Sequence, residues 1–425
     1  MMTQPANANG RTLNRRDFLR NSLSQGALLG CSAAASPLLT PVTWAAGPWD
    51  HRLVVIILRG GMDGLDVLRP VGDPDFATLR APLLSSGAAG LDLTGFHQMH
   101  PALAPLLPLW RRGELGFVQA VSTPYRDKRS HFDGQDLLEA GTADLTAAGR
   151  DGWLNRMLQT VPGLSGQTAF SVGHDNMLLL RGAADVAHWS PDVALSLSPQ
   201  GARLAELVMH DDPAFHDAFL EAQQLMLARA TSDGLAMDAA AADMMMEQGG
   251  MAVTSQTDGR PAGIEAIAHF TAERLREETR IAAFSIGGWD THRRQVRGMD
   301  QALGSLVQAI EALRTDLGDV WQKTAVVAMT EFGRTARANG TDGTDHGTGG
   351  TMMFAGGALR GGRVYGDWPG LSEAALYDRR DVMPLGDVRA YAGQIMRGLF
   401  GLDRSVIETQ VFPGVDLAQA PALHL

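Results

Sequence analysis

Residues 52–58 have the sequence Arg-Leu-Val-Val-Ile-Ile-Leu and are followed directly by Arg59-Gly60-Gly61. The stretch is short, apolar after its first residue and rich in β-branched side chains, and it ends at a pair of glycines. This pattern is typical of a strand that is buried on both faces, as in a parallel sheet covered by helices. We therefore expect residues 52–58 to form a central strand of such a sheet.

Three later segments repeat this pattern, and a predicted helix precedes each of them. The segments are residues 115–121, 281–286 and 324–329, and the helices before them are residues 101–112, 266–278 and 299–317. Strands that alternate with helices favour βαβ units. The sequence therefore predicts an α/β fold with a mostly parallel central sheet flanked by helices.

A Met/Ala-rich segment at about residues 180–260 interrupts the alternation and includes Met244-Met245-Met246. We interpret it as a helical insertion packed over the sheet, with the methionines as adaptable core. A last amphipathic helix is predicted around residues 387–399. The length suits a single α/β domain over residues 46–425.

Residues 1–45 have the three parts of an export signal. Arg15 and Arg16 precede a mildly apolar stretch over residues 21–42, and small residues follow at Ala45 and Ala46. Paired arginines at this position indicate twin-arginine export. The expected partner is the twin-arginine translocase, and the mature protein is expected in the periplasm or outside the cell.

Two alternatives to a cleaved twin-arginine signal peptide are open. One is an ordinary amphipathic helix, which Pro37 and Pro41 disfavour because proline breaks a helix. The other is a lipid anchor, since Leu28-Leu29-Gly30-Cys31 resembles a lipobox whose cysteine is acylated. Cys31 is the single cysteine of the chain, which excludes an internal disulfide and a cysteine-based metal site.

The charge distribution argues against a nucleic-acid partner. The net charge is -11, and the first 45 residues contribute +3 to it, which leaves -14 for the remainder. A strongly negative protein is poorly suited to bind a polyanion. After Ala46 no stretch reaches the roughly 18 uncharged apolar residues that a spanning helix needs, so no transmembrane segment is expected in the mature chain.

Polar residues follow each predicted strand, where the carboxyl ends of a parallel sheet place ligands. These candidate residues are Asp63 after the first strand, Ser130 and His131 after the second, Asp290 and His292 after the third, and Glu331, Arg334, Asp345 and His346 after the fourth. Carboxylates and imidazoles on separate loops are the ligands of a divalent metal ion, with Zn, Ca, Mg and Mn as candidates. The pattern therefore predicts a metal site at one sheet edge.

Each residue taken alone also has a structural interpretation. Asp63 could hydrogen-bond its own glycine turn, and Asp290 and Glu331 could cap following helices. His131 and His346 could be structural histidines with satisfied hydrogen bonds. Their joint occurrence at successive strand ends favours the metal site.

Several motifs together resemble the bacterial domain of unknown function 1501 family. They are Leu-Arg-Gly-Gly-Met-Asp-Gly-Leu at 58–65, His-Pro-Ala-Leu at 100–103, Ser-His-Phe-Asp at 130–133, Gly-Gly-Trp-Asp-Thr-His at 287–292, Glu-Phe-Gly-Arg-Thr at 331–335 and Thr-Asp-His-Gly at 344–347. The resemblance runs from about residue 51 to residue 400. It implies an alkaline phosphatase/sulfatase-like sandwich and a metal-dependent hydrolase.

The resemblance also implies roles for individual residues. The metal ligands would be Asp63, Asp290, His292, Glu331, Asp345 and His346. Ser130 would be the nucleophile, His131 a ligand or proton donor, and Arg334, Arg59 or Arg129 the clamp of an anionic substrate. The sequence departs from the wider group in two ways: Phe332 stands where a histidine is usual, and Asp290-Thr291-His292 is more tightly spaced.

We therefore expect an exported, metal-dependent hydrolase of a phosphate or sulfate ester, acting on a small anionic ester or a saccharide. The alternative is a non-catalytic periplasmic binding or assembly protein on the same fold. Phe332 motivates the alternative, because its side chain cannot ligate a metal.

Overall fold

The computed structural model describes residues 49–126, 128–144, 151–173, 177–190 and 263–425. The expected signal peptide at 1–45 and most of the expected helical insertion at 180–260 lie outside these described residues. Ala46–Leu425 forms one compact unit.

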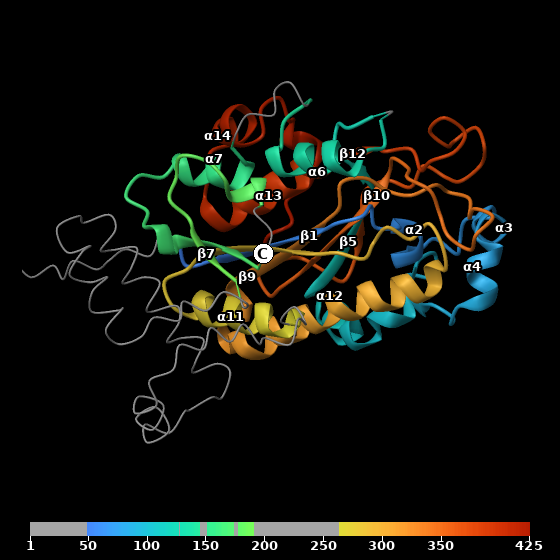
Figure 1. The fold of residues 1–425 in the computed structure, drawn as a ribbon, viewed down its shortest axis with the longest axis horizontal. Coiled ribbons are helices and arrows are strands. Elements are labelled where there is room, and N and C mark those ends of the chain that lie inside the picture. The colour runs from blue at the N-terminus through green and yellow to red at the C-terminus, as the bar shows by residue number, and fades with distance from the viewer. Residues whose placement is uncertain (1–48, 127, 145–150, 174–176, 191–262) are drawn as a thin grey trace, which may run out of the picture. The chain divides into compact units, whose positions relative to one another are not determined.

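A nine-stranded sheet lies at the centre of the described part of this unit, with the strand order β11-β5-β10-β9-β1-β8-β6-β7 and β12 beside β5 (Figure 1). Its strands are β1 (Arg52–Leu58), β5 (Leu115–Ser122), β6 (Ala169–Val172), β7 (Ala187–Trp189), β8 (Ile281–Ile286), β9 (Thr324–Met329), β10 (Gly350–Ala355), β11 (Val364–Tyr365) and β12 (Gly386–Asp387). The four strands expected from the sequence are β1, β5, β8 and β9, and all four are confirmed.

The sheet is mostly parallel. β1 pairs in parallel with β8 and β9, with Leu53 opposite both Ile281 and Ala325. β10 is antiparallel to both of its neighbours, β9 and β5. Because β5 and β9 are both antiparallel to β10, β5 runs in the same direction as β9 and therefore as β1. The carboxyl ends of β1, β5, β8 and β9 thus lie at one edge of the sheet.

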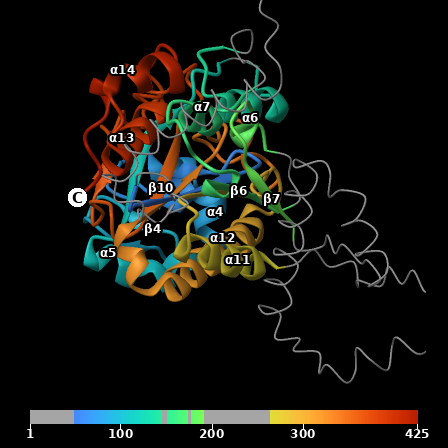
Figure 2. The same cartoon turned by 90° about the vertical axis from the view of Figure 1, so that its left-hand side faces the viewer.

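Alternate residues of β1 face opposite layers, as the two-residue period of a strand requires. Leu53, Val55 and Ile57 belong to the core shared with two helices, α7 (Trp153–Gln159) and α13 (Val388–Phe400). Val54, Ile56 and Leu58 belong to the core shared with three others, α5 (Leu107–Arg112), α11 (Ile264–Arg276) and α12 (Gln295–Leu317). Figures 1 and 2 show these two groups of helices on opposite faces of the sheet. Burial on both faces explains why the sequence of β1 is continuously apolar.

The helices of the described residues are α2 (Gly64–Val67), α3 (Phe76–Leu79), α4 (Ala81–Ser86), α5 (Leu107–Arg112), α6 (His131–Ala140), α7 (Trp153–Gln159), α11 (Ile264–Arg276), α12 (Gln295–Leu317), α13 (Val388–Phe400) and α14 (Arg404–Val406). The helices expected at 266–278, 299–317 and 387–399 are confirmed as α11, α12 and α13. The helix expected at 101–112 is a 3-10 helix in its first half, Pro101–Leu106, and an α-helix in its second half, which is α5. Pro105 lies inside that half and lacks the N–H that an α-helix needs.

A small antiparallel sheet of β2 (Leu68–Arg69), β4 (Gln98–Met99) and β3 (Leu91–Asp92) lies apart from the central sheet. Within the described ranges, every helix is too short or too polar to cross a lipid bilayer.

Candidate metal centre

Loops from three strand ends bring three histidines and one aspartate together. His131 is the first residue of α6, after β5; Asp290 and His292 follow β8; and His346 lies in the long connection between β9 and β10. We call these four residues the histidine cluster. Three possible ligand atoms, one each from His131, Asp290 and His346, all lie within 4.8 Å of one another.

The Oδ1 atom of Asp290 is the centre of the cluster. It lies 3.1 Å from the Nε2 of His292, 3.3 Å from that of His346 and 3.5 Å from that of His131. The Nε2 atoms of His292 and His346 are 2.9 Å apart. Two ligands of a tetrahedral zinc ion with bonds of about 2.0–2.1 Å are separated by about 3.3–3.4 Å. The distances from Asp290 Oδ1 to the three Nε2 atoms are close to this value.

In each of the three histidines the second ring nitrogen, Nδ1, makes a hydrogen bond that fixes the orientation of the ring. The Nδ1 of His346 lies 2.8 Å from the carbonyl oxygen of Arg129, which can only accept, so this Nδ1 carries the proton. The Nδ1 of His131 lies 2.7 Å from Glu331 Oε1, and that of His292 lies 3.1 Å from Asp345 Oδ1.

This arrangement turns each Nδ1 to an acceptor and directs the Nε2 atoms of the three rings towards Asp290 Oδ1. The Nε2 of His131 is buried and has no hydrogen-bond partner among the described atoms. Lone pairs at such distances repel unless a proton or a cation lies between them. Histidines that donate Nδ1–H to a carboxylate or carbonyl and turn Nε2 inward are typical of metal ligands. The residues present therefore fit a divalent cation.

The carboxylates around the cluster are kept ionised. Burial works to raise the pKa of Glu331, but hydrogen bonds from His131, Gln135 and the Gly60 N–H outweigh it and lower the pKa. Burial likewise opposes ionisation of Asp290, and the hydrogen bond and charge of Arg334 lower its pKa overall. A negative charge is thus maintained beside the imidazoles.

Two half-buried imidazoles, those of His131 and His346, have pKa values that shift in opposite directions. The hydrogen bond to Glu331 raises the pKa of His131, despite partial burial. Burial lowers the pKa of His346, and the nearby Arg334 charge adds to this effect. A carboxylate that makes Nε2 more electron-rich also makes it a better metal ligand.

Arg334 is buried and links the loops after β1, β8 and β9. Its guanidinium donates to the carbonyl oxygens of Gly60, Gly61, Trp289 and Thr344 and to Asp290 Oδ1 at 2.6 Å. Four of these five bonds hold backbone, so Arg334 acts as a positioning residue for the loops. The Arg334 side chain is fully buried, and the expected role as a substrate clamp stays a prediction.

Asp63 lies in a neighbouring buried network. Its carboxylate pairs with Arg80 and accepts from Gln295 at 2.7 Å and from Thr344 at 3.3 Å. It also accepts a hydrogen bond from the N–H of Leu65 at 3.1 Å, as expected if Asp63 stabilises its own turn. None of these partners belongs to the histidine cluster. Burial opposes the ionisation of Asp63, but the charge and hydrogen bonds of Arg80 lower its pKa overall.

The capping interpretation of Asp290 and Glu331 is wrong for the described residues. The helix nearest to Asp290 along the chain, α12, starts at Gln295 with Arg294 as its N-cap, and Glu331 is followed by bridged turns and no helix. Ser130, in contrast, is the N-cap of α6, where its Oγ accepts from the Asp133 N–H at 3.4 Å.

Phe332 forms an apolar wall on the cluster. Its ring centre lies 5.1 Å from that of His131 and 5.0 Å from that of His346, and it stacks on Tyr125 at 6.2 Å. The Cβ that a side chain would add at Gly61 would meet this ring at 2.7 Å, so glycine is required there. The other expected arginines make ion pairs: Arg59 pairs with Glu139 at 2.8 Å and Arg129 with Asp381 at 3.8 Å.

Residues 119–390 of the chain match the family model described as protein of unknown function (DUF1501). The chain belongs to the DUF1501 family. The cluster residues and their hydrogen-bonding partners Arg129, Glu331 and Asp345 all fall inside the matched region. No curated protein matches the chain.

Three solved structures are similar to the chain over most of its length. The lipoteichoic acid synthase LtaP from Listeria monocytogenes is 8% identical, with 88% of this chain and 78% of that chain covered and a TM-score of 0.37. The C-terminal periplasmic domain of EcEptC from Escherichia coli, in complex with Zn, is 9% identical (73% and 74% covered, TM-score 0.34). The alkaline phosphatase from the Antarctic bacterium TAB5 is 10% identical (72% and 91% covered, TM-score 0.33).

Sequence reasoning missed the residues that orient the cluster. Gln135 donates to Glu331 Oε1 at 3.1 Å, and Asn339 donates to Asp345 Oδ1 at 3.3 Å. Gln135 stands four residues after His131, so the helical period places both on one face of α6, and this spacing was a usable signal. The carbonyl of Arg129 has no sequence signal, because every residue has a carbonyl.

Proposed function

We propose that this protein is an exported, metal-dependent hydrolase of a phosphate or sulfate ester. The observation that carries the proposal is the convergence of three Nε2 atoms on Asp290 Oδ1, with each Nδ1 already occupied. The ligands would be His131, Asp290, His292 and His346. Imidazole and carboxylate ligands suit zinc best among the candidate ions.

The bound cation would polarise a phosphoryl or sulfuryl oxygen and lower the pKa of a nearby hydroxyl. The chain's own residues would keep the ligands in place. Glu331 and Asp345 hold two imidazoles in one tautomer, and Arg334 holds Asp290 through a bond of 2.6 Å. Phe332 excludes water from one side of the rings.

Ser130 is the proposed nucleophile. It directly precedes His131, and its Oγ accepts a single long hydrogen bond of 3.4 Å, which leaves its own proton available. The Oγ would form a bond to phosphorus or sulfur while the bond to the ester oxygen breaks and that oxygen takes up a proton. Water would then cleave the serine ester and release phosphate or sulfate.

A second candidate is a non-catalytic binding or assembly protein whose site keeps at most one ion. Phe332 motivates it, because this side chain cannot ligate a metal and lies against the ring of His131. Asp63 also has Arg80 as its counter-ion, which argues against a second ion there. Turnover belongs only to the first candidate.

Metal content and ester hydrolysis of the purified protein test the proposal together. Elemental analysis should find about one equivalent of a divalent metal, and 4-nitrophenyl phosphate or 4-nitrophenyl sulfate should be cleaved. His346→Ala should lose both properties. The matched control is His269→Ala, because His269 is an exposed histidine on α11 that pairs with Asp316 away from the cluster.

Three outcomes are separable. Bound metal with turnover supports the hydrolase, and bound metal without turnover on any ester of a broad panel supports the second candidate. Absence of metal, even after incubation with Zn²⁺, together with no turnover on any ester contradicts the hydrolase and favours the second candidate.

The export part of the proposal is tested separately. Replacing both Arg15 and Arg16 with lysine should hold the full chain in the cytoplasm, since lysine does not reproduce the planar guanidinium. Cell fractionation with immunoblotting measures this. An unchanged periplasmic yield of the double variant would contradict twin-arginine export.

A further inference from the structure

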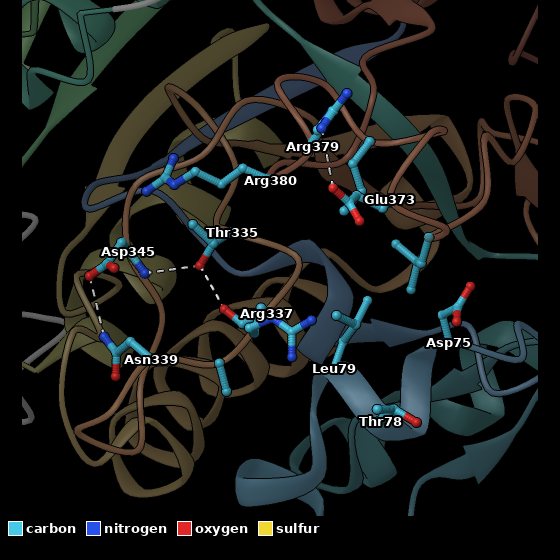
Figure 3. Close-up of a pocket in the computed structure, with 13 residues that line it drawn as sticks. Asp75, Thr78, Leu79, Thr335, Arg337, Asn339, Asp345, Glu373, Arg379 and Arg380 are labelled. Atoms are coloured by element: carbon cyan, nitrogen blue, oxygen red, sulfur yellow. Dashed lines mark hydrogen bonds and ion pairs between the residues drawn. The ribbon is translucent and has the colours of Figure 1, made fainter.

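A pocket with a volume of about 640 Å³ lies next to the histidine cluster (Figure 3). Asp345 and Asn339 stand at one end of it, and Asp75 and Thr78 stand at the other. Pockets of about 300–1,000 Å³ are of a size that holds small-molecule ligands.

The pocket wall and the surroundings of the cluster share residues. Asp345 lines the pocket and also holds the Nδ1 of His292 at 3.1 Å. Arg380 lines the pocket and donates to the carbonyl oxygen of His346 at 2.9 Å. A group in this pocket would therefore lie beside the cluster, one side chain away from its imidazoles.

Among the described residues, one arginine of the pocket has no counter-ion. Arg379 pairs with Glu373 at 3.6 Å, and Arg380 pairs with Asp381 at 2.9 Å. The guanidinium of Arg337 is exposed and makes no ion pair or hydrogen bond within the described parts of the chain. An uncompensated guanidinium in a pocket is suited to an oxyanion, because it can bind one with two parallel hydrogen bonds.

The far end of the pocket has acceptor groups instead. The carboxylate of Asp75 makes no side-chain hydrogen bond to any described residue, and Thr78 beside it is exposed. An ionised carboxylate only accepts hydrogen bonds, so it suits hydroxyl groups of a ligand. The lining residues include no aromatic side chain, which disfavours a flat apolar ligand.

We propose that this pocket binds the leaving group of the substrate, and that this group is a hydroxylated acid. Arg337 would bind its carboxylate, phosphate or sulfate, and Asp75 and Thr78 would accept and donate hydrogen bonds to its hydroxyls. The assignment as a leaving group rests on the proposed hydrolase function. The binding of a hydroxylated anion does not, because it needs no turnover.

Calorimetric titration of the full chain with three matched probes tests this. The probes are D-glucuronate, which carries a carboxylate, D-glucose 6-phosphate, which carries a phosphate, and neutral D-glucose. At least one anion should bind at least about tenfold more tightly than glucose, since one charge-assisted hydrogen-bond pair contributes a factor of this order. Arg337→Gln should remove that difference.

The matched control is Arg276→Gln, which removes the same charge from an exposed arginine on α11 that also has no ion pair among the described residues. It should bind all three probes as the unaltered protein does. Preference for one anion over the other identifies a carboxylate or a phosphate as the recognised group.

The inference and the proposed function can fail separately. Equal binding of all probes, no binding of either anion at about 10 mM, or an unchanged preference in Arg337→Gln would overturn the pocket assignment while leaving ester hydrolysis intact. Loss of anion preference in Arg337→Gln in a protein that cleaves no ester would leave the pocket as a binding site and remove its role as a leaving-group site.

Discussion

Replacing Asp290 with alanine should remove the bound metal and with it the metal-dependent part of the stability. Its Oδ1 lies 3.1–3.5 Å from the three Nε2 atoms, so this one oxygen faces every other proposed ligand. The substitution also removes the anionic partner of Arg334, which is fully buried. Two effects are therefore expected, and only one depends on metal.

The metal-dependent effect can be given a magnitude. An ion present at 100 times its dissociation constant stabilises the folded state by about 2.7 kcal/mol. With an unfolding entropy of about 2.1 cal/mol/K for each residue of the roughly 380-residue unit Ala46–Leu425, this corresponds to about 3 °C in Tm. The loss of the Arg334 partner adds about 1–2 kcal/mol, discounted because the Asp290 side chain is 47% exposed, and this loss occurs with or without metal.

Calorimetric melting with EDTA and with added Zn²⁺ separates the two effects. The unaltered protein should melt about 3 °C higher with Zn²⁺, and Asp290→Ala should show no such rise. Asp290→Asn is the matched variant, because its amide oxygen can still accept from Arg334 while the negative charge is gone. It should recover part of the metal-free stability and little of the metal response. An unchanged zinc response and metal content in Asp290→Ala would refute Asp290 as a ligand.

Three further substitutions test the groups around the cluster. Glu331→Gln should weaken metal affinity about 10- to 100-fold in a competition titration with a chelator, because it removes the carboxylate that holds His131; unchanged affinity would mean that Glu331 only fills space. Ser130→Ala should keep the metal, lose about 1 kcal/mol from the N-cap of α6 and abolish ester hydrolysis; full activity would end the nucleophile proposal. Asp63→Asn should lower Tm by an amount that is constant above about pH 5 and shrinks below the carboxyl's usual pKa of 3.8. The effect shrinks at low pH because the folded-state pKa of Asp63 is lowered, so the stabilisation from its ionised form is lost as the pH falls. Asp319→Asn, at an exposed aspartate, is the control. A Tm difference between Asp63→Asn and the unaltered protein that does not change with pH would contradict this account.

The sequence predicted the central sheet well because burial on both faces constrains many neighbouring residues at once. β1, β8 and β9 have the expected bounds, since a continuous apolar run ends where the chain leaves the core. The 3-10 half of the helix at 101–112 was missed, although Pro105 was visible in the sequence.

The sequence by itself determined which residues reach the carboxyl edge of the sheet, because strand ends are local features of hydrophobic patterning. Only the tertiary structure decided which of them meet. Asp63 and Asp290 follow neighbouring parallel strands, yet Asp63 pairs with Arg80 while Asp290 faces three imidazoles. That choice depends on loop paths, such as the one that places the carbonyl of Arg129 against His346, 217 positions away in the chain. Backbone groups carry no sequence signal, so their contribution to the site follows from folding alone.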